Sequence, residues 1–344
     1  MKSIAEAVDS LGGMAQKQQL VRLGATDRDL TYAYQQRWVI RARNGWYSTK
    51  PENSPEVRAV RVGGRLTGIS ALIAMGAWVL DTDQPLHVSV HDNAARLRSQ
   101  INRRVRFDAE QMPGVVLHWD AIDVAERGTA ESVGLTDALF RVIVDEPLEV
   151  AVACLDWALH TRVLRRFEFR RLIRSLPVEY RYVEDFVDGA CESLPESLSK
   201  TRLKLRGHRV TTQVRLPDGK RIDLVVDDIV GLETDGREFH VDAFEIDRSK
   251  DIDIILADYL PMRVSAHMVF HDWGRVYLAM VVMVHSRSPH RPLRSEIQEI
   301  VAAAELCAAT FRHPPTREER KVLNFRQSDA PGGNSPQPTS LHPV

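Results

Sequence analysis

Over the first fifty residues, apolar positions recur at helical spacing in three short runs, and each run ends at a stop signal. A Ser-x-x-Glu capping box opens the first helix, and two more helices are expected over about 15–23 and 27–37. Asn44-Gly45 then lies between two β-rich runs, which is a strong hairpin signal. Three short helices followed by a hairpin is the order of a winged helix-turn-helix, which we predict over 1–50.

The middle of the chain, over about 55–185, mixes the helical period with short apolar runs typical of strands. The expected elements are a helix over 70–79, strands over 86–90 and 115–119, a helix ending near Asp145, and a helix from Pro147 to about His160. We therefore predict a mixed α/β domain. Four histidines are scattered through it and are expected to be ordinary surface or core residues: His87, His91, His118 and His160.

A third region, over 190–312, alternates predicted helices and strands, and the remaining residues, 313–344, are rich in Pro, Gly, Ser and charge. We expect a third α/β domain followed by a disordered tail. The apolar run Val276–Val284 is too short to span a bilayer and is expected to be a buried strand, as is the segment MRVSAHMVF. The fold class predicted is thus a multidomain α/β protein.

The stretch RIDLVVDDIVGLETDGREFH, residues 221–240, reads as a hairpin with an unusual number of carboxylates. A two-residue turn at Asp227-Asp228 would place Asp223 and Glu233 on opposite faces. A three-residue turn, Asp227 to Ile229, would pair Asp223 directly with Glu233. Two carboxylates so paired repel one another, and a divalent cation between them would remove the repulsion. The sequence leaves both registers open.

Composition adds mainly exclusions. The formal net charge is −1, so any nucleic-acid binding must come from local patches rather than a global excess of charge. The three cysteines, Cys154, Cys191 and Cys307, are far apart and form neither a metal-binding spacing nor a disulfide framework. Because no signal-peptide core is present near the start, we expect a cytoplasmic protein that does not interact with membranes.

Arginine and amide side chains on the third predicted helix and the hairpin could read base edges and phosphates of double-stranded DNA. They are Arg28, Gln35, Gln36 and Arg37 on the helix, beside Tyr32, and Arg41, Arg43 and Asn44 near the hairpin tip. Tyr32 and Trp38 are expected to belong to the core. Two further arginine-rich stretches, ARLRSQINRRVRF and RVLRRFEFRRLIR, are interpreted as solvated helix faces over an apolar stripe, with a phosphate-contacting surface as the alternative.

The N-terminal pattern resembles the winged-helix domain of AbiEi-family antitoxins. The resemblance is carried by the Leu-Gly-Gly segment at Leu11, by Leu23-Gly24, and by the closing Arg-x-Arg-x-Gly-x-Tyr from Arg41 to Tyr47. The order of elements in the middle region is similar to the second domain of that family. The resemblance implies a transcriptional autoregulator that neutralises a nucleotidyltransferase-like toxin encoded alongside it.

The C-terminal stretch resembles the PD-(D/E)xK nucleases, and among them the Vsr-like endonuclease-related domains. Glu233-Thr234-Asp235-Gly236 and His240 match that branch, a leading helix would carry Glu196, and a following helix carries Asp247, Arg248 and Asp251 in register. The usual lysine is missing, because Asp235 stands in its place. The fold implied is a restriction-endonuclease-like α/β domain.

The resemblance implies a role for each of these residues. Asp223, Glu233 and the carbonyl of Thr234 would ligate Mg²⁺ or Mn²⁺, and the catalytic set would be Glu196, Asp223, Glu233, Asp235 and His240. Arg237 and Arg248 could contact phosphate. We therefore predict a DNA-binding protein of the AbiEi type whose last domain hydrolyses DNA phosphodiesters with Mg²⁺. The alternatives are a non-catalytic antitoxin and repressor that keeps a nuclease fold only for binding, and a protein-interaction scaffold.

Overall fold

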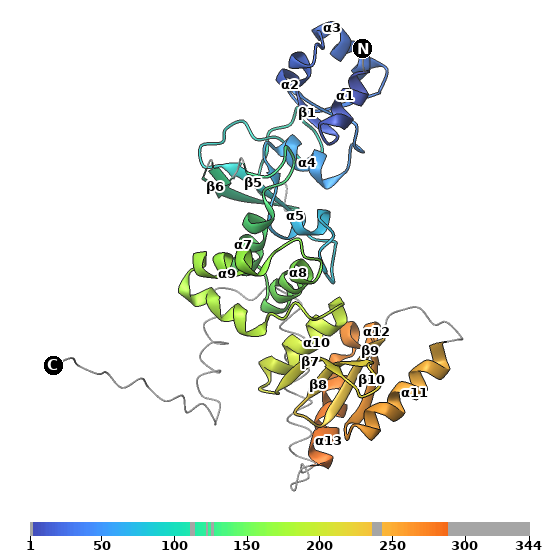
Figure 1. The fold of residues 1–344 in the computed structure, drawn as a ribbon. Helices are drawn as coiled ribbons and strands as arrows, with labels where there is room; N and C mark the ends of the chain where they lie inside the picture. Colours follow the sequence, from blue (N-terminus) through green and yellow to red (C-terminus); the bar gives the residue numbers. More distant parts are fainter. Residues whose placement is uncertain (1–2, 111–113, 122, 125–126, 236–242, 288–344) are drawn as a thin grey trace, which may run out of the picture.

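The computed structural model describes residues 3–110, 114–121, 123–124, 127–235 and 243–287, and over 243–248 it describes the backbone alone. The predicted α/β class is confirmed, because helices combine with three small sheets in the described residues. Figure 1 shows three parts stacked along one axis, with the N-terminal helices at one end and the residues beyond 194 at the other. The predicted tail over 313–344 and the third region beyond 287 lie outside the described residues.

The N-terminal part has its helices and hairpin in the predicted order. Its elements are α1 (Ile4–Ser10), β1 (Met14–Gln16), α2 (Lys17–Arg22), α3 (Asp27–Gln35), β2 (Ile40–Arg43) and β3 (Trp46–Ser48). β3 pairs antiparallel with both β1 and β2. The side chains of Ser3 and Thr26 cap α1 and α3. The prediction of helix from Ala15 was wrong, because Ala15 pairs with Tyr47 as part of β1.

The middle part contains the two predicted strands and the two predicted long helices. Its elements are α4 (Pro55–Val62), β4 (Arg65–Leu66), α5 (Gly68–Ala74), β5 (Leu86–His91), β6 (Val115–Asp120), α7 (Leu135–Asp145), α8 (Leu148–His160), α9 (Arg166–Ser175) and a 3₁₀ helix over Val178–Phe186. β5 lies between β4 and β6 and is parallel to β6. α5 stops five residues before the predicted 79, because Gly76 takes a left-handed φ of 86°.

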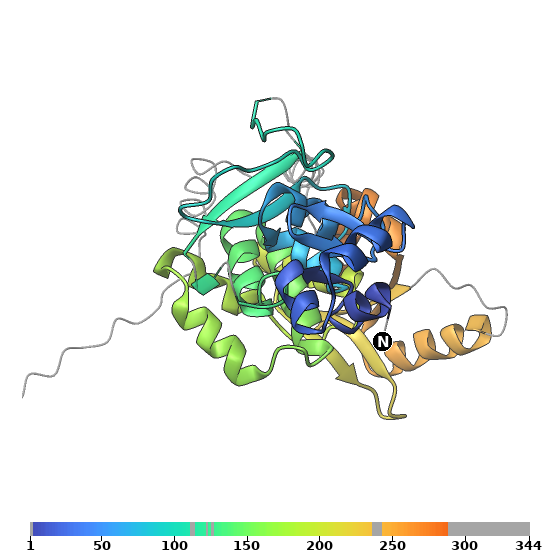
Figure 2. The ribbon, with the colours of Figure 1, turned by 90° about the horizontal axis from the view of Figure 1, so that it is seen from above.

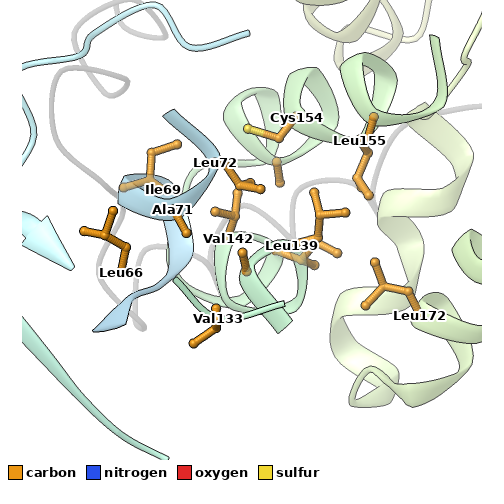
Figure 3. Packing of buried hydrophobic residues seen from close by; sticks show 14 of the residues in the cluster. Leu66, Ile69, Ala71, Leu72, Val133, Leu139, Val142, Cys154, Leu155 and Leu172 are labelled. Atoms are coloured by element: carbon orange, nitrogen blue, oxygen red, sulfur yellow. The ribbon is translucent and has the colours of Figure 1, made fainter. Parts of the chain in front are cut away.

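Apolar side chains from α4, α5, α7, α8, α9 and the 3₁₀ helix, together with strands β4, β5 and β6, form the core of the middle part. Figure 3 shows Ile69 and Leu72 of α5 facing Val142 of α7, with Leu172 of α9 on the other side of the cluster. On α9 the arginines are exposed above buried Leu172 and Ile173, as the solvated-face interpretation expected. The other arginine-rich stretch, 95–107, forms loops rather than the expected helix.

The C-terminal part begins with a helix, continues through three antiparallel strands and a second helix, and then adds a parallel strand. These elements are α10 (Leu194–Leu205), β7 (Val210–Arg215), β8 (Arg221–Val226), β9 (Val230–Asp235), α11 (Ala243–Leu256) and β10 (Leu260–Ser265), followed by α12 (Ala266–His271) and α13 (Trp273–Ser286). The sheet order is β10-β9-β8-β7. Figures 1 and 2 show α11 at the outer side of this sheet, away from α10.

One strand prediction in this part was wrong, and another was confirmed only for its first four residues, Met262 to Ser265. Val276–Val284 lies within α13, where Val276 is buried one turn before Met280 and Val281. An apolar run of that length has no polar positions to reveal its period, so helix and strand could not be distinguished. The strand expected over MRVSAHMVF ends at Ser265, whose side chain accepts the backbone N–H of Met268 and starts α12.

Buried charges join α8 of the middle part to α10 of the C-terminal part. Lys200 and Asp156 are both fully buried and are joined by Nζ to Oδ2 at 2.6 Å. Asp156 Oδ2 also accepts the Ser197 hydroxyl, and its Oδ1 accepts the Asp188 N–H. A second buried pair, Arg202 with Glu149, crosses the same interface at 2.7 Å. These two buried ion pairs fix the two parts against each other here.

Candidate functional site

The β8–β9 hairpin has the three-residue turn. Val226 pairs with Val230 and Leu224 with Leu232, so the turn is Asp227 to Ile229. Asp227 and Asp228 have φ values of 53° and 56°, a left-handed conformation that aspartate tolerates better than most residues. They are turn residues, as expected. Asp227 is also held in place by the His208 ring and the Arg209 N–H.

This register brings Asp223 and Glu233 side by side. The Asp223 N–H donates to Glu233 Oε1 at 3.2 Å, and Asp223 Oδ2 accepts the Thr234 N–H at 2.9 Å. The other oxygen of Glu233, Oε2, binds the ammonium group of Lys250 from α11. Glu233 is 4% exposed, so this is a buried carboxylate with one fixed cation. Sequence reasoning did not find Lys250.

Burial makes both carboxylates harder to ionise. Burial, followed by the charge of Asp223, raises the pKa of Glu233 to about 7. Burial also raises the pKa of Asp223, against the stabilising effect of the Thr234 N–H and of Lys250. The single ammonium group of Lys250 thus offsets only part of the cost of holding two carboxylates together.

The strands change faces at this point. Val214 and Ile222 pack with Ile254 of α11, whereas Leu224, the next apolar residue of β8, packs in the cluster on the α10 side. The β7–β8 register pairs Thr212 with Leu224 and Val214 with Ile222, and it leaves out Asp223 and Gln213, whose φ of 52° is left-handed. Strict alternation therefore fails at Asp223, and the irregular residues leave its side chain beside Glu233 rather than in a core.

Glu196 lies next to this pair, on α10. Its Oε2 accepts the Nε2–H of Gln213 at 3.0 Å and the N–H of Glu192 at 2.9 Å. Burial raises its pKa, and the charge of Asp223 raises it further, which indicates that the two carboxylates are electrostatic neighbours. Of the five predicted catalytic residues, the structure therefore pairs Asp223 with Glu233. Glu196 and Asp235 are linked to Asp223 only through charge, because Asp223 raises the pKa of Glu196 and Asp235 raises the pKa of Asp223.

Asp235 has a different partner. Its Oδ1 binds Arg263 of β10 at 3.1 Å, and the same guanidinium binds Asp251 of α11 at 2.7 Å. It faces a cation instead of supplying one. His240 and Arg237 lie outside the described residues, and the side chain of Arg248 lies outside them too. The structure therefore gives no position for the predicted general base.

Few possible metal ligands surround Asp223 and Glu233 in the part of the chain that the structure describes. Among the described side chains there is no group of three or more His, Cys, Asp or Glu that could hold a metal. Asp223 Oδ1 accepts no hydrogen bond from a described residue, and each Glu233 oxygen has a lone pair left beyond its single bond. Two carboxylates with the Thr234 carbonyl would leave the other coordination positions to water, which Mg²⁺ commonly retains.

Most of the predicted DNA-contacting residues are exposed at the N-terminal end. Arg28, Gln35, Gln36, Arg37 and Asn44 all face solvent. Arg37 follows α3 with a left-handed φ of 57°. Tyr32 and Trp38, expected in the core, are 52% and 50% exposed and meet edge to face at 5.5 Å between ring centroids. That expectation was wrong, because Leu30 and Ala33 fill the inner face of α3 instead.

Two arginines predicted for the hairpin tip have internal partners. Arg41 lies over the rings of Tyr34 and Tyr47 at 5.0 and 5.4 Å and donates to the Tyr47 hydroxyl. Arg43 donates to the carbonyls of Val62 at 2.7 Å and Arg96 at 3.0 Å, which ties β2 to the middle part. These bonds occupy the donors with which Arg43 was expected to reach DNA.

Two of the scattered histidines form a buried pair in the middle part. His118 Nε2 and His87 Nδ1 are 3.1 Å apart, and His118 Nδ1 is 3.6 Å from a carboxylate oxygen of Asp145. Burial, with the nearby charge of Arg141, lowers the pKa of each ring to about 4. Both rings are therefore neutral near pH 7, as expected of core residues.

This pair predicts a loss of stability in mild acid. The folded pKa lies below the unfolded value of about 6.5, so the unfolded chain binds protons first as the pH falls. Between about pH 6.5 and pH 4 the free energy of unfolding should fall, by on the order of 1–2 kcal/mol per histidine at pH 5. Urea titrations at several pH values would measure this slope. His118→Gln should flatten it, and His267→Gln, an exposed control, should leave it unchanged. An equal slope in all three proteins would refute this explanation.

No protein-family model matches this chain, and no curated protein matches it. Within the described residues, no helix combines the length and the apolar character needed to cross a membrane. The interpretation of both candidate sites therefore rests on the residues themselves.

Proposed function

We propose that the C-terminal part is a divalent-metal-dependent DNA endonuclease of the PD-(D/E)xK type, attached to an N-terminal winged helix that binds double-stranded DNA. The observation that carries this proposal is the three-residue turn, which sets Asp223 beside Glu233 with the Lys250 ammonium group against them. The order of α10, β7, β8, β9, α11 and β10 supports it, because a helix, three antiparallel strands, a helix and a parallel strand suit such a domain.

Both side chains of the pair would bind the metal ion in this proposal. Asp223 Oδ1 and a Glu233 oxygen would hold Mg²⁺ or Mn²⁺, with the carbonyl of Thr234. When bound, the ion lowers the pKa of a water ligand and neutralises charge on the scissile phosphate. Asp223 is fixed by the Thr234 N–H, so its free oxygen is directed without further reorganisation. Glu233 is fixed by the Asp223 N–H in the same way.

Lys250 supplies the positive charge that Asp235 cannot. Its ammonium group reaches Glu233 from α11, whereas the lysine of the motif was expected on β9 at position 235. Beside a scissile phosphate it would stabilise the charge that develops during hydrolysis. Asp235, paired with Arg263, then serves to orient that arginine between β9 and α11.

A second function remains in competition: a non-catalytic antitoxin and repressor that uses the nuclease fold only for binding. The observation favouring it is that Lys250 already partners Glu233 in a site with only two adjacent acidic ligands. Such a protein would bind operator DNA through the exposed residues around α3 and would neutralise a toxin encoded alongside. Its DNA binding would not require Asp223.

Incubation of supercoiled plasmid with the full chain tests the proposed hydrolysis. We expect nicked and then linear DNA with Mg²⁺ or Mn²⁺ and none with EDTA, because two carboxylates cannot organise an attacking water without the ion. Plasmids carrying different inserts guard against a sequence requirement. Plasmid that stays supercoiled in every metal condition, while a labelled duplex is still bound, would support the repressor function instead.

A further inference from the structure

A hollow rich in arginine lies where the middle part meets the C-terminal part. It has a volume of about 550 Å³ and is open to solvent. Arg162, Arg165 and Arg166 enter it from the turn between α8 and α9, and Arg221 and Gln213 enter from β8 and β7. The site therefore combines cations from two parts that the buried charges of α8 and α10 hold in a fixed relation.

The guanidinium groups of this hollow are only partly neutralised. Arg165 pairs with Glu168 at 2.9 Å and Arg221 with Glu192 at 2.8 Å. Arg162 and Arg166 have no side-chain hydrogen bond or ion pair with any residue that the structure describes. Two uncompensated guanidinium groups facing one solvent-filled space favour a ligand with several anionic oxygens, and phosphate matches their planar donor fork.

The backbone gives a second indication. Arg162 follows the end of α8 with a φ of 62°, at a position where glycine or asparagine is usual. Gln213, across the hollow, has a φ of 52° within a strand. Residues in sparsely populated backbone conformations of this kind cluster at functional sites. An arginine kept at a glycine position points to a use for its guanidinium group.

The hollow shares a wall with the carboxylate site. Gln213 lines the hollow and donates to Glu196, the electrostatic neighbour of Asp223. Arg221 precedes Asp223 by two residues in β8. We propose that the hollow binds a phosphate of a DNA backbone that continues to the Asp223–Glu233 pair, an inference that rests on the proposed action on DNA. It would fix the strand so that a neighbouring phosphodiester meets the carboxylates.

The test is duplex binding by the full chain in EDTA, measured by fluorescence anisotropy over a range of salt concentrations. Arg166→Ala should weaken binding on the order of fivefold or more and reduce the salt slope by about 1. Arg162→Gly should weaken it similarly, yet raise the melting temperature, because glycine relieves the left-handed strain. Arg170→Ala, exposed on α9 outside the hollow, is the matched control and should have a smaller effect.

Two results would overturn the inference. One is unchanged duplex affinity and salt slope in both hollow variants. The other is loss of inorganic pyrophosphate binding in these variants without any loss of duplex binding, which would assign the hollow to a free phosphate ligand. EDTA prevents metal-dependent cleavage, so the binding assay is independent of hydrolysis. If the wild type never cleaves plasmid but Arg166→Ala weakens duplex binding, the proposed hydrolysis is refuted. The same result supports phosphate binding in the hollow.

Discussion

Replacement of Lys250 by methionine should lower plasmid cleavage by about 10²- to 10³-fold while strengthening Mn²⁺ binding. The two effects have opposite signs because the ammonium group lies close both to the expected phosphate position and to a proposed metal ligand. In the proposed hydrolysis it would stabilise negative charge near the scissile phosphate, and it would also compete with the metal ion for Glu233 Oε2, which it binds in the structure. Cleavage rates with saturating Mn²⁺ and calorimetric titration of Mn²⁺ would measure the two effects separately.

Lys220→Met provides the matched control for Lys250. Lys220 also reaches α11 from the hairpin side, but it binds Asp218 and Asp253 away from the carboxylate pair. We expect its cleavage rate and Mn²⁺ affinity to stay near those of the wild type. Full cleavage by Lys250→Met, or weaker Mn²⁺ binding, would contradict the role given to Lys250.

Lys200→Met should destabilise the protein by about 3–5 kcal/mol, because it leaves Asp156 buried without a cation. The melting temperature should fall by roughly 10 °C for a chain of this size. Scanning calorimetry measures the change directly and also shows whether the middle and C-terminal parts still unfold together. We expect their transitions to separate, because the pair joins α8 to α10.

Lys204 lies one turn further along α10, and Lys204→Met serves as the control. Its ammonium group meets only the carbonyl of Asp185 at an exposed position, so little stability should be lost. The double variant Asp156→Leu with Lys200→Met should recover much of the loss, since it removes both charges. A melting temperature close to that of the wild type in Lys200→Met would show that Asp156 is not held as a buried charge.

The sequence predicted the fold best where capping residues and turn motifs mark the ends of helices and strands. The cap at Thr26, the Asn44-Gly45 turn and the two strands of the middle part all fall where they were expected. Failures came where tertiary contacts decide. Ala15 was predicted to be helical but pairs with Tyr47 in a strand. The apolar run in α13 has no polar positions that would distinguish a helical from a strand period.

For the candidate site, the sequence predicted only two alternatives, a two-residue and a three-residue turn in the hairpin. The sequence named Asp223 and Glu233 but could not choose the turn length, because Asp227, Asp228 and Ile229 suit either register. Lys250 lies 17 residues beyond Glu233 on a helix, so no strand motif could associate them. Its contact exists because α11 packs against the sheet. The exposed ring of Trp38 and the internal bonds of Arg43 likewise depend on neighbours distant in sequence.

The central claim is that Asp223, placed beside Glu233 by the three-residue turn, holds the metal for DNA hydrolysis. The most direct test compares plasmid cleavage by Asp223→Asn and Asp228→Asn, two equal changes in one hairpin. Asp228 is exposed and pairs only with Arg209. With Mg²⁺ we predict wild-type cleavage by Asp228→Asn and a loss of about 10³-fold by Asp223→Asn with an unchanged melting temperature. Equal cleavage by both variants would contradict the claim.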